Sequence, residues 1–251
     1  MGEASAPRDS ASQVARATLG LRDMLLRGVF KPGQRIAEIP LSAKLGVSRT
    51  PLRLAFEKLE HEGLVKALPH SGFTPNEFSV PDIWDSLEIR GILEGAAARL
   101  AAERLTNPAQ LEPLRKINSE MEAFSSLEFE NFGLYLELNE SFHTGILNLA
   151  NNRMLRRSLE QLYRLPFVQP SSRLLRHNSL PGSREIRPVA EEHHRAIVDA
   201  IEHREGARAE SLGREHVRLS RSNLEGDLAD RNFLEIVPGG HLIKVRNADR
   251  A

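Results

Sequence analysis

The chain has 251 residues, of which 40% are hydrophobic and 5% aromatic, and its 34 basic side chains balance 34 acidic ones. It contains no cysteine, which excludes disulfide bonds, thiolate metal sites and cysteine nucleophiles. No apolar run approaches the ~20 residues of a membrane span, and the N-terminus lacks the apolar stretch of a signal peptide, so we expect a cytoplasmic protein with no membrane partner.

Charge is unevenly distributed along the chain. Residues 1–75 carry 11 Lys/Arg and 7 Asp/Glu, whereas the remainder carries 23 basic and 27 acidic residues. A basic N-terminal part followed by an acidic C-terminal part indicates two domains with separate roles. The abundance of leucine, alanine, glutamate and arginine predicts a mainly α fold.

The N-terminal part begins with three predicted helices. After a polar stretch over residues 1–10, which we expect to be a disordered tail, apolar residues at helical spacing predict a helix over residues 13–26. A Pro-Gly turn follows, and a short helix begins near Pro40. A glycine turn then leads to a third helix over residues 49–61, with Ser48 as its predicted N-cap.

Two short extended runs follow the third helix. The stretches "LVKAL" and "FTP" are separated by "PHSG", which predicts a hairpin with Gly72 near its tip. Three helices followed by a hairpin are the element order of a winged helix-turn-helix. We therefore expect residues 11–76 to form a DNA-binding domain.

The stretch "LGVSRTPLR" places two arginines at the start of the third helix. Because the helix dipole already makes that end positive, Arg49 and Arg53 oppose the usual preference unless an anion outside the protein faces them. In a helix-turn-helix this helix enters the major groove, where arginine pairs with guanine or phosphate and hydroxyl groups bind phosphates. The expected DNA contacts are Ser48, Arg49, Thr50 and Arg53 in the helix and His70, Ser71 and Gly72 in the wing. The competing interpretation is a solvated, arginine-bearing helix in an ordinary bundle.

The C-terminal part is expected to be an antiparallel all-helical bundle of about six helices. Its predicted helices span about residues 80–104, 108–126, 128–150, 152–166, 185–204 and 207–225. We assign residues 80–225 to this domain. Residues 226–251 alternate apolar runs around a Pro-Gly-Gly turn, which predicts a β-hairpin, with a disordered tail as the alternative.

Four side chains of this bundle have the types and spacing of a metal site. Asn139 and His143 are four residues apart on one helix face, and His194 and His216 fall on later helices that an antiparallel bundle brings together. Of the adjacent His193 and His194, the second shares a face with neighbouring apolar residues, so it is expected inside. An oxygen donor with three imidazoles suits a divalent transition metal, zinc first, with nickel, manganese or iron as alternatives. The competing interpretation of each histidine is a hydrogen-bonded core residue.

Residues 13–76 resemble the DNA-binding domain of the GntR family of bacterial transcription regulators. The resemblance is carried by "LRDMLLRGVFKPGQRI", "LSAKLGVSRTPLR", "LEHEGLV" and a glycine near the wing tip. It implies that Arg49, Thr50, Arg53 and Gly72 contact operator DNA.

Residues 80–224 resemble the FCD ligand-binding domain that follows the winged helix in the FadR subfamily. The resemblance is carried by "LEIRGILEGAAARLAAERLT", "LNESFHTGILNLANN" and "HHRAIVDAI…REHV". It implies a divalent metal that helps to bind a carboxylate effector. The implied ligands are Asn139, His143, His194 and His216. Two roles remain open for Arg90: an ion pair with Glu94, four residues on, or a fork for the effector carboxylate.

Three hypotheses follow for the function. The first is a homodimeric transcription regulator whose affinity for double-stranded operator DNA changes when a small organic acid binds beside the metal. The second is a metal-dependent enzyme that carries a DNA-binding module, with the acids Glu140, Glu191 or Glu192, interpreted as surface residues, as general base; no HExxH motif supports it. The third keeps the DNA-binding domain but makes the metal site purely structural. We predict the first, a regulator and not an enzyme.

Overall fold

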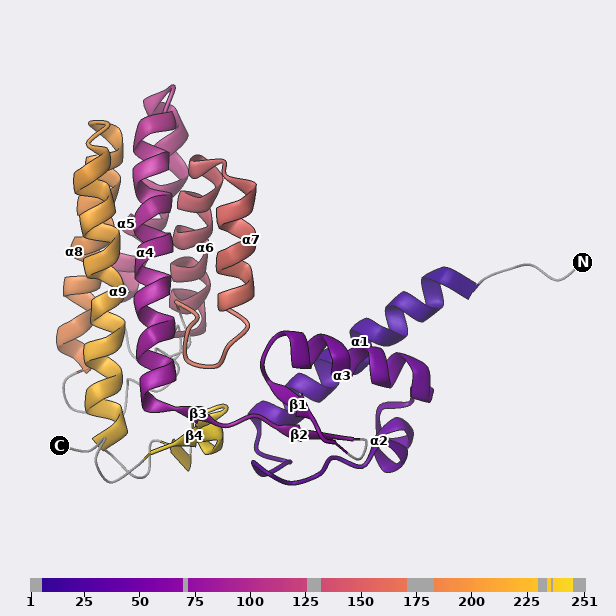
Figure 1. The fold of residues 1–251 in the computed structure, drawn as a ribbon. Coiled ribbons are helices and arrows are strands. Elements are labelled where there is room, and N and C mark those ends of the chain that lie inside the picture. Colours follow the sequence, from indigo (N-terminus) through magenta and orange to yellow (C-terminus); the bar gives the residue numbers. More distant parts are fainter. Residues whose placement is uncertain are drawn as a thin grey trace, which may run out of the picture. The chain divides into compact units, whose positions relative to one another are not determined.

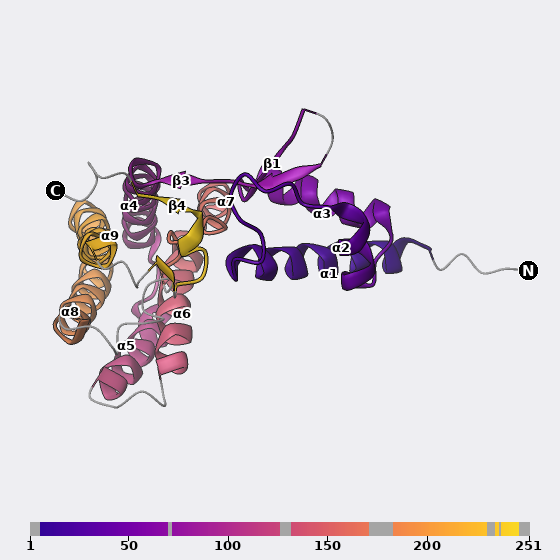
Figure 2. The ribbon, with the colours of Figure 1, turned by 90° about the horizontal axis from the view of Figure 1, so that it is seen from below.

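The computed structural model of the chain describes residues 6–69, 72–125, 132–170, 183–229, 234–235 and 237–245. The chain divides into two compact units, one comprising Met1–Val80 with Arg231–Ala251 and the other Pro81–Asp230. Helices predominate in both units (Figures 1 and 2), so the predicted mainly α fold is confirmed. Among the described helices, none combines the length and apolar character that crossing a bilayer requires.

The first unit is a winged helix-turn-helix. Its elements are α1 (Ala6–Leu26), α2 (Glu38–Leu45), α3 (Arg49–His61), β1 (Val65–Ala67) and β2 (Phe73–Pro75). The strands pair antiparallel, and the apolar faces of the three helices meet in one core. Phe56 of α3 stacks on Phe73 of β2 with ring centroids 4.5 Å apart, which fixes the wing to the third helix.

The turn between α2 and α3 depends on a glycine. Gly46 ends α2 with a left-handed φ of 62°, a conformation that glycine adopts without steric cost. Ser48 occupies the N-cap position of α3 with extended backbone angles, as predicted, although its side chain makes no capping hydrogen bond. The first-turn N–H groups of α3 are therefore without a side-chain cap from this residue.

The first helix is longer than predicted. It begins at Ala6, so residues 6–10, which we expected in a disordered tail, are helical. Pro7 lies in the first turn, where its missing N–H costs no hydrogen bond. Residues 1–5 lie outside the described residues.

The second unit is a bundle of six helices in the part of the chain that the structure describes. These are α4 (Val80–Arg104), α5 (Glu112–Ser125), α6 (Phe132–Ala150), α7 (Arg153–Leu162), α8 (Ser183–Glu202) and α9 (Gly206–Ala229), with the short 3-10 helix η1 (Pro108–Leu111) before α5. Alanines along α4 pack with aliphatic side chains of α5, α6 and α8 in one core. The predicted helices correspond to these elements, although α7 ends four residues before its predicted end.

Two glycines let α4 and α9 approach closely. A Cβ on Gly95 would lie 2.7 Å from the backbone oxygen of Glu210, and one on Gly213 would lie 3.1 Å from the Cα of Gly95. Real Cβ atoms essentially never lie under 3.0 Å from backbone, so the crossing requires glycine at position 95, and the 3.1 Å distance at position 213 is tight for any other residue. The close crossing brings Glu94 of α4 and His216 of α9 to the same cavity.

The predicted C-terminal hairpin is wrong. Instead, β4 (Ile243–Lys244) pairs in parallel with β3 (Phe78–Ser79), the segment that precedes α4. Gly239, with φ of 83°, donates its N–H to the backbone oxygen of Leu26 at 2.7 Å, so the Pro-Gly-Gly turn bends the chain onto the end of α1. The C-terminal segment therefore packs within the first unit, and α9 extends to Ala229, past the predicted end of the helical domain.

Candidate functional site

The exposed face of α3 carries four of the predicted DNA contacts. Ser48, Arg49, Thr50 and Arg53 are all exposed, whereas the opposite face of the helix is buried in the core of the unit. The sequence pattern thus separates a core-facing side from a solvent-facing side that carries cations and hydroxyl groups.

The two arginines of α3 have no partner among the described residues. Neither Arg49 nor Arg53 makes a hydrogen bond or ion pair there, and the first turn of α3 contains no acidic residue. By contrast, Arg22 pairs with Glu62, and Arg27 pairs with Asp23 at 2.7 Å in the same unit. The unpaired guanidinium groups therefore add to the positive end of the helix and are free to bind an anion in a bidentate manner.

A further cationic side chain, Arg35, lies beside the wing. Gly72 has φ of 96°, and a Cβ there would lie 2.9 Å from Nε of Arg35, so the arginine side chain lies against the glycine. Arg35 is exposed, and the sequence analysis did not single it out; its position just after the Pro-Gly turn was the available signal. The predicted contacts His70 and Ser71 lie outside the described residues.

Three of the four predicted metal ligands meet inside the second unit. His143 of α6, His194 of α8 and His216 of α9 are buried, and one ligand atom from each lies within 4.8 Å of the others. The Nε2 atoms of His194 and His216 are 3.3 Å apart, close to the spacing of ~3.3 Å between two ligands 2.0–2.1 Å from a tetrahedral zinc. His194 is 1% exposed and His193 is only half-buried, in line with the expectation that position 194 faces inward.

The arrangement includes a carboxylate that the sequence analysis gave no role at the metal. Oε2 of Glu94 lies 3.0 Å from Nδ1 of His143, and the Nε2 atom of that histidine is buried without a hydrogen-bond partner. A histidine held through one ring nitrogen by a carboxylate, with the other nitrogen free, is the usual arrangement of a metal-bound imidazole. The residues present therefore fit a divalent metal, held by the three histidines and oriented by Glu94.

The surroundings of the histidine cluster determine the protonation states of its side chains. Burial, and then the neighbouring imidazoles, lower the pKa of both His194 and His216 well below the ordinary value, so both are neutral near pH 7. Burial alone would raise the pKa of Glu94, but the charge of Arg90 and then the contact with His143 lower it well below the ordinary carboxyl range. Neutral imidazoles and an ionised carboxylate are the forms that metal binding requires.

Arg90 is buried inside the bundle and forms an ion pair with Glu94. Its Nε donates to Oε1 of Glu94 at 2.6 Å, and both side chains are buried. The Tyr163 hydroxyl also donates to Oε1 of Glu94, at 2.7 Å. The predicted ion pair is therefore present, and Glu94 joins Arg90, Tyr163 and His143 in one buried network.

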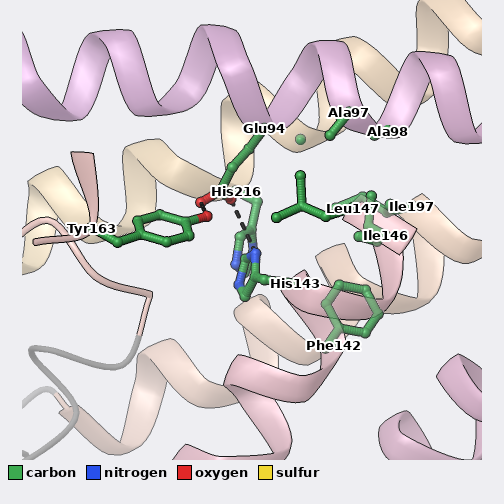
Figure 3. Close-up of a pocket in the computed structure, with 11 residues that line it drawn as sticks. Glu94, Ala97, Ala98, Phe142, His143, Ile146, Leu147, Tyr163, Ile197 and His216 are labelled. Atoms are coloured by element: carbon green, nitrogen blue, oxygen red, sulfur yellow. Dashed lines mark hydrogen bonds and ion pairs between the residues drawn. The ribbon is translucent and has the colours of Figure 1, made fainter. Parts of the chain in front are cut away.

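A cavity adjoins this network (Figure 3). Polar groups of Glu94, His143, Tyr163 and His216 line one part of it. The remaining wall is apolar and consists of Ala97, Ala98, Phe142, Ile146, Leu147 and Ile197, with Gly213. The space inside it is only about 10 Å³, room for about one water molecule, so a larger ligand requires the surrounding side chains to move apart.

The other predicted site residues have different positions. Asn139 is buried on α6, one turn before His143. Of the three acids considered as a general base, Glu140 and Glu192 are exposed, but Glu191 is 7% exposed, so its interpretation as a surface residue was wrong. The residue lies on α8, three positions before His194, on the inward side of that helix.

Comparisons with known proteins agree with the two-part architecture. Residues 85–219 match the family described as the FCD domain, and residues 13–74 match the family described as bacterial regulatory proteins, gntR family. Among curated proteins, the chain is 34% identical over 133 residues to the Nta operon transcriptional regulator of Aminobacter aminovorans, covering 53% of this chain and 61% of that protein. It is 34% identical over 143 residues to an uncharacterized HTH-type transcriptional regulator in the TAR-I ttuE-ttuC' intergenic region of Agrobacterium vitis, covering 56% of this chain and 82% of that protein.

Solved structures share the fold. The chain matches E. coli McbR/YncC with a TM-score of 0.62 and 22% identity, over 86% of this chain and 98% of the other. It matches Lar, described as controlling the agr system of Listeria monocytogenes, with a TM-score of 0.59 and 23% identity, over 84% and 96% of the two chains.

Proposed function

Because the chain belongs to the GntR family of bacterial regulatory proteins and carries an FCD domain, we propose that it is a transcription regulator that binds operator DNA through α3 and the wing. The single observation that carries this proposal is the pair of exposed guanidinium groups at the positive end of α3, which have no partner in the part of the chain that the structure describes. The relatives described above are named as transcriptional regulators, which gives no support to the enzyme hypothesis.

In this proposal α3 lies in the major groove of the duplex. Arg49 and Arg53 bind guanine edges or phosphates. The hydroxyl groups of Ser48 and Thr50 donate hydrogen bonds to phosphates beside the helix N-terminus. The wing contacts the neighbouring backbone through the glycine at its tip and through Arg35. A homodimer would place two such helices on two half-sites of one operator.

We further propose that a divalent metal is held by His143, His194 and His216, with zinc as the first candidate. The neutral oxygen of Asn139 is the proposed fourth donor, and it brings no charge to offset the cation. A small organic acid is the proposed effector, with its carboxylate at the metal and its apolar part against the apolar wall of the cavity. Arg90 is the proposed second contact of that carboxylate. Glu94 accepts from the Nε atom of Arg90, so an incoming carboxylate would bind through the Nη atoms of the guanidinium group or displace Glu94.

Binding of such an acid would regulate DNA affinity by stabilising one arrangement of the bundle. A change of tenfold to a hundredfold in operator affinity requires only about 1.4–2.7 kcal/mol of differential binding. A carboxylate that binds a metal and accepts charge-assisted hydrogen bonds gains interaction free energy of that size.

The DNA part of the proposal is tested by selecting duplexes from the genomic DNA of the source organism with the full-length chain. Replacing Arg49 with alanine is expected to weaken binding to the selected duplex about 10- to 100-fold, since a good bidentate contact contributes about 1–3 kcal/mol. Arg27→Ala, which removes one exposed charge from the same unit, is the control and should have a small effect. Equal losses in the two variants would contradict the role of α3.

The effector part is tested by thermal unfolding of the full-length chain with and without metal, across dicarboxylates and sugar acids. An acid present at 100 times its Kd is expected to stabilise the protein by about 2.7 kcal/mol, and only when metal is bound. A large stabilisation by metal with no response to any acid would instead favour a purely structural metal site.

A further inference from the structure

One large aliphatic side chain stands on the exposed face of α3. Leu54 is 44% exposed and directly follows Arg53. We propose that Leu54 contacts the 5-methyl group of thymine in the major groove and thereby selects a T·A pair at one position of each half-site. This inference rests on the proposed binding of DNA by α3.

The position of Leu54 around the helix supports this assignment. The buried residues of α3 are Pro51, Leu52, Ala55, Phe56 and Leu59. With about 100° per residue, these leave an exposed arc of about half the helix circumference. Arg53 and Leu54 lie about 50° to either side of the middle of that arc. A groove that receives Arg53 therefore also receives Leu54.

Leu54 has one exposed neighbour with a methyl group, Thr50, while the exposed residues one turn later, Glu57 and Lys58, are charged. Thr50 lies one turn earlier on the same side of α3, so its methyl group is the neighbour of the leucine. Leu54 is not part of the core cluster on the other face of the same helix. An exposed leucine on a proposed DNA-binding face is positioned to meet an apolar group on the DNA.

The chemistry of the major groove identifies that group. Guanine, cytosine and adenine present only hydrogen-bond donors and acceptors on their major-groove edges, whereas thymine adds a C5-methyl group. Leucine makes no hydrogen bond, so its favourable contact with a base edge is with this methyl group. The arginines are then expected to read guanine or phosphate, and Leu54 to read thymine, on the same face.

The test uses the duplex that the full-length wild-type chain selects from a random-sequence library. Each thymine of that duplex is replaced in turn by deoxyuridine, which keeps all hydrogen-bonding groups and removes only the methyl group. We expect one thymine per half-site to show about a fourfold loss of affinity, the size expected for one buried methyl group. Leu54→Ala should bind the wild-type and the deoxyuridine duplexes equally. Leu19→Ala, at a leucine that is 68% exposed on α1, is the matched control and should retain the difference.

Two results would overturn the inference while leaving the proposed function intact. One is a wild-type protein that selects a duplex but tolerates deoxyuridine at every position. The other is a methyl effect that persists unchanged in Leu54→Ala. If the wild-type chain enriches no duplex, the proposed DNA binding fails and this inference fails with it.

As a second variant, Leu54→Glu is expected to shift the selected base from thymine to cytosine, because a carboxylate accepts a hydrogen bond from the cytosine N4 amino group. An unchanged thymine preference would contradict the assignment.

Discussion

The buried ion pair between Arg90 and Glu94 gives a quantitative test of the network in the second unit. The same helix carries a second ion pair with the same spacing, Arg99 with Glu103. The two pairs differ in exposure, since the side chains of the first are 1% and 8% exposed and those of the second 40% and 48%. Glu94→Gln and Glu103→Gln therefore make the same chemical change in two environments.

The expected magnitudes follow from that difference in burial. Removing one partner of a buried ion pair costs about 3–5 kcal/mol because the other charge stays buried without compensation. Glutamine keeps one hydrogen-bond acceptor for Arg90, so we expect the lower value, about 3 kcal/mol, for Glu94→Gln. An exposed i,i+4 pair contributes about 0.3–0.5 kcal/mol, so Glu103→Gln should cost no more than that. Arg99 also keeps a second partner, Glu210, at 2.9 Å.

The assay is urea unfolding in the presence of a metal chelator, followed by tryptophan fluorescence. The chain has one tryptophan, Trp84 in α4, so the signal reports the helical unit and not the winged helix. Equal destabilisation by the two variants would refute the assignment of a buried, charge-compensating role to Glu94.

A double variant separates this effect from a general packing defect. Arg90→Met combined with Glu94→Gln removes both charges, and replacement of a whole buried pair by neutral groups is often neutral or stabilising. We therefore expect the double variant to be more stable than Glu94→Gln alone. A double variant that is less stable than either single one would show that the two side chains act independently.

Three further predictions concern metal, helix crossing and the C-terminal segment. His194→Ala should lose bound metal by elemental analysis while His193→Ala retains it, because only the first joins the buried cluster; the reverse result would show that the other histidine is the ligand. Gly95→Ala should lower the free energy of unfolding by about 1–3 kcal/mol, since its Cβ would lie 2.7 Å from a backbone oxygen of α9, whereas Gly133→Ala, with open space around it, should not destabilise the fold. Gly240→Ala should lower the melting temperature of the first unit, since its Cβ would meet a backbone carbonyl at 2.1 Å; an unchanged melting temperature would mean that the C-terminal segment adds no stability.

Local sequence signals were sufficient for the winged helix-turn-helix. A glycine that ends α2, apolar spacing along α3 and a short hairpin each have a short-range physical cause, so their order along the chain predicts the arrangement. The C-terminal segment shows where this reasoning stops. Its alternating apolar residues were interpreted as a hairpin, but β4 pairs with β3, which is more than 160 residues away in the sequence. A strand's partner depends on tertiary contacts that its own pattern does not contain.

The candidate metal site was partly accessible to the same reasoning. Helical spacing put Asn139 and His143 on one face, apolar periodicity put His194 inside, and the antiparallel order brought the helices of His194 and His216 together. Glu94 was recognised only as a partner for Arg90, because an i,i+4 pair on one helix is visible in sequence while a contact with a histidine on α6 is not. The close crossing at Gly95 also depends on the partner helix, so the sequence alone did not reveal it.

The position of Glu94 links the two proposed ligands of the second unit. One of its oxygens accepts from Arg90, and the other lies against the histidine that would hold the metal. In the proposed function, an acid on Arg90 would compete with or lie beside the first contact, and a metal on His143 would strengthen the second by raising the acidity of the imidazole N–H. Metal and acid therefore act on one carboxylate, and any free energy by which the metal changes acid binding must equal the free energy by which the acid changes metal binding. Under the proposed function, Glu94 is the side chain through which such coupling would act, because it contacts both Arg90 and His143.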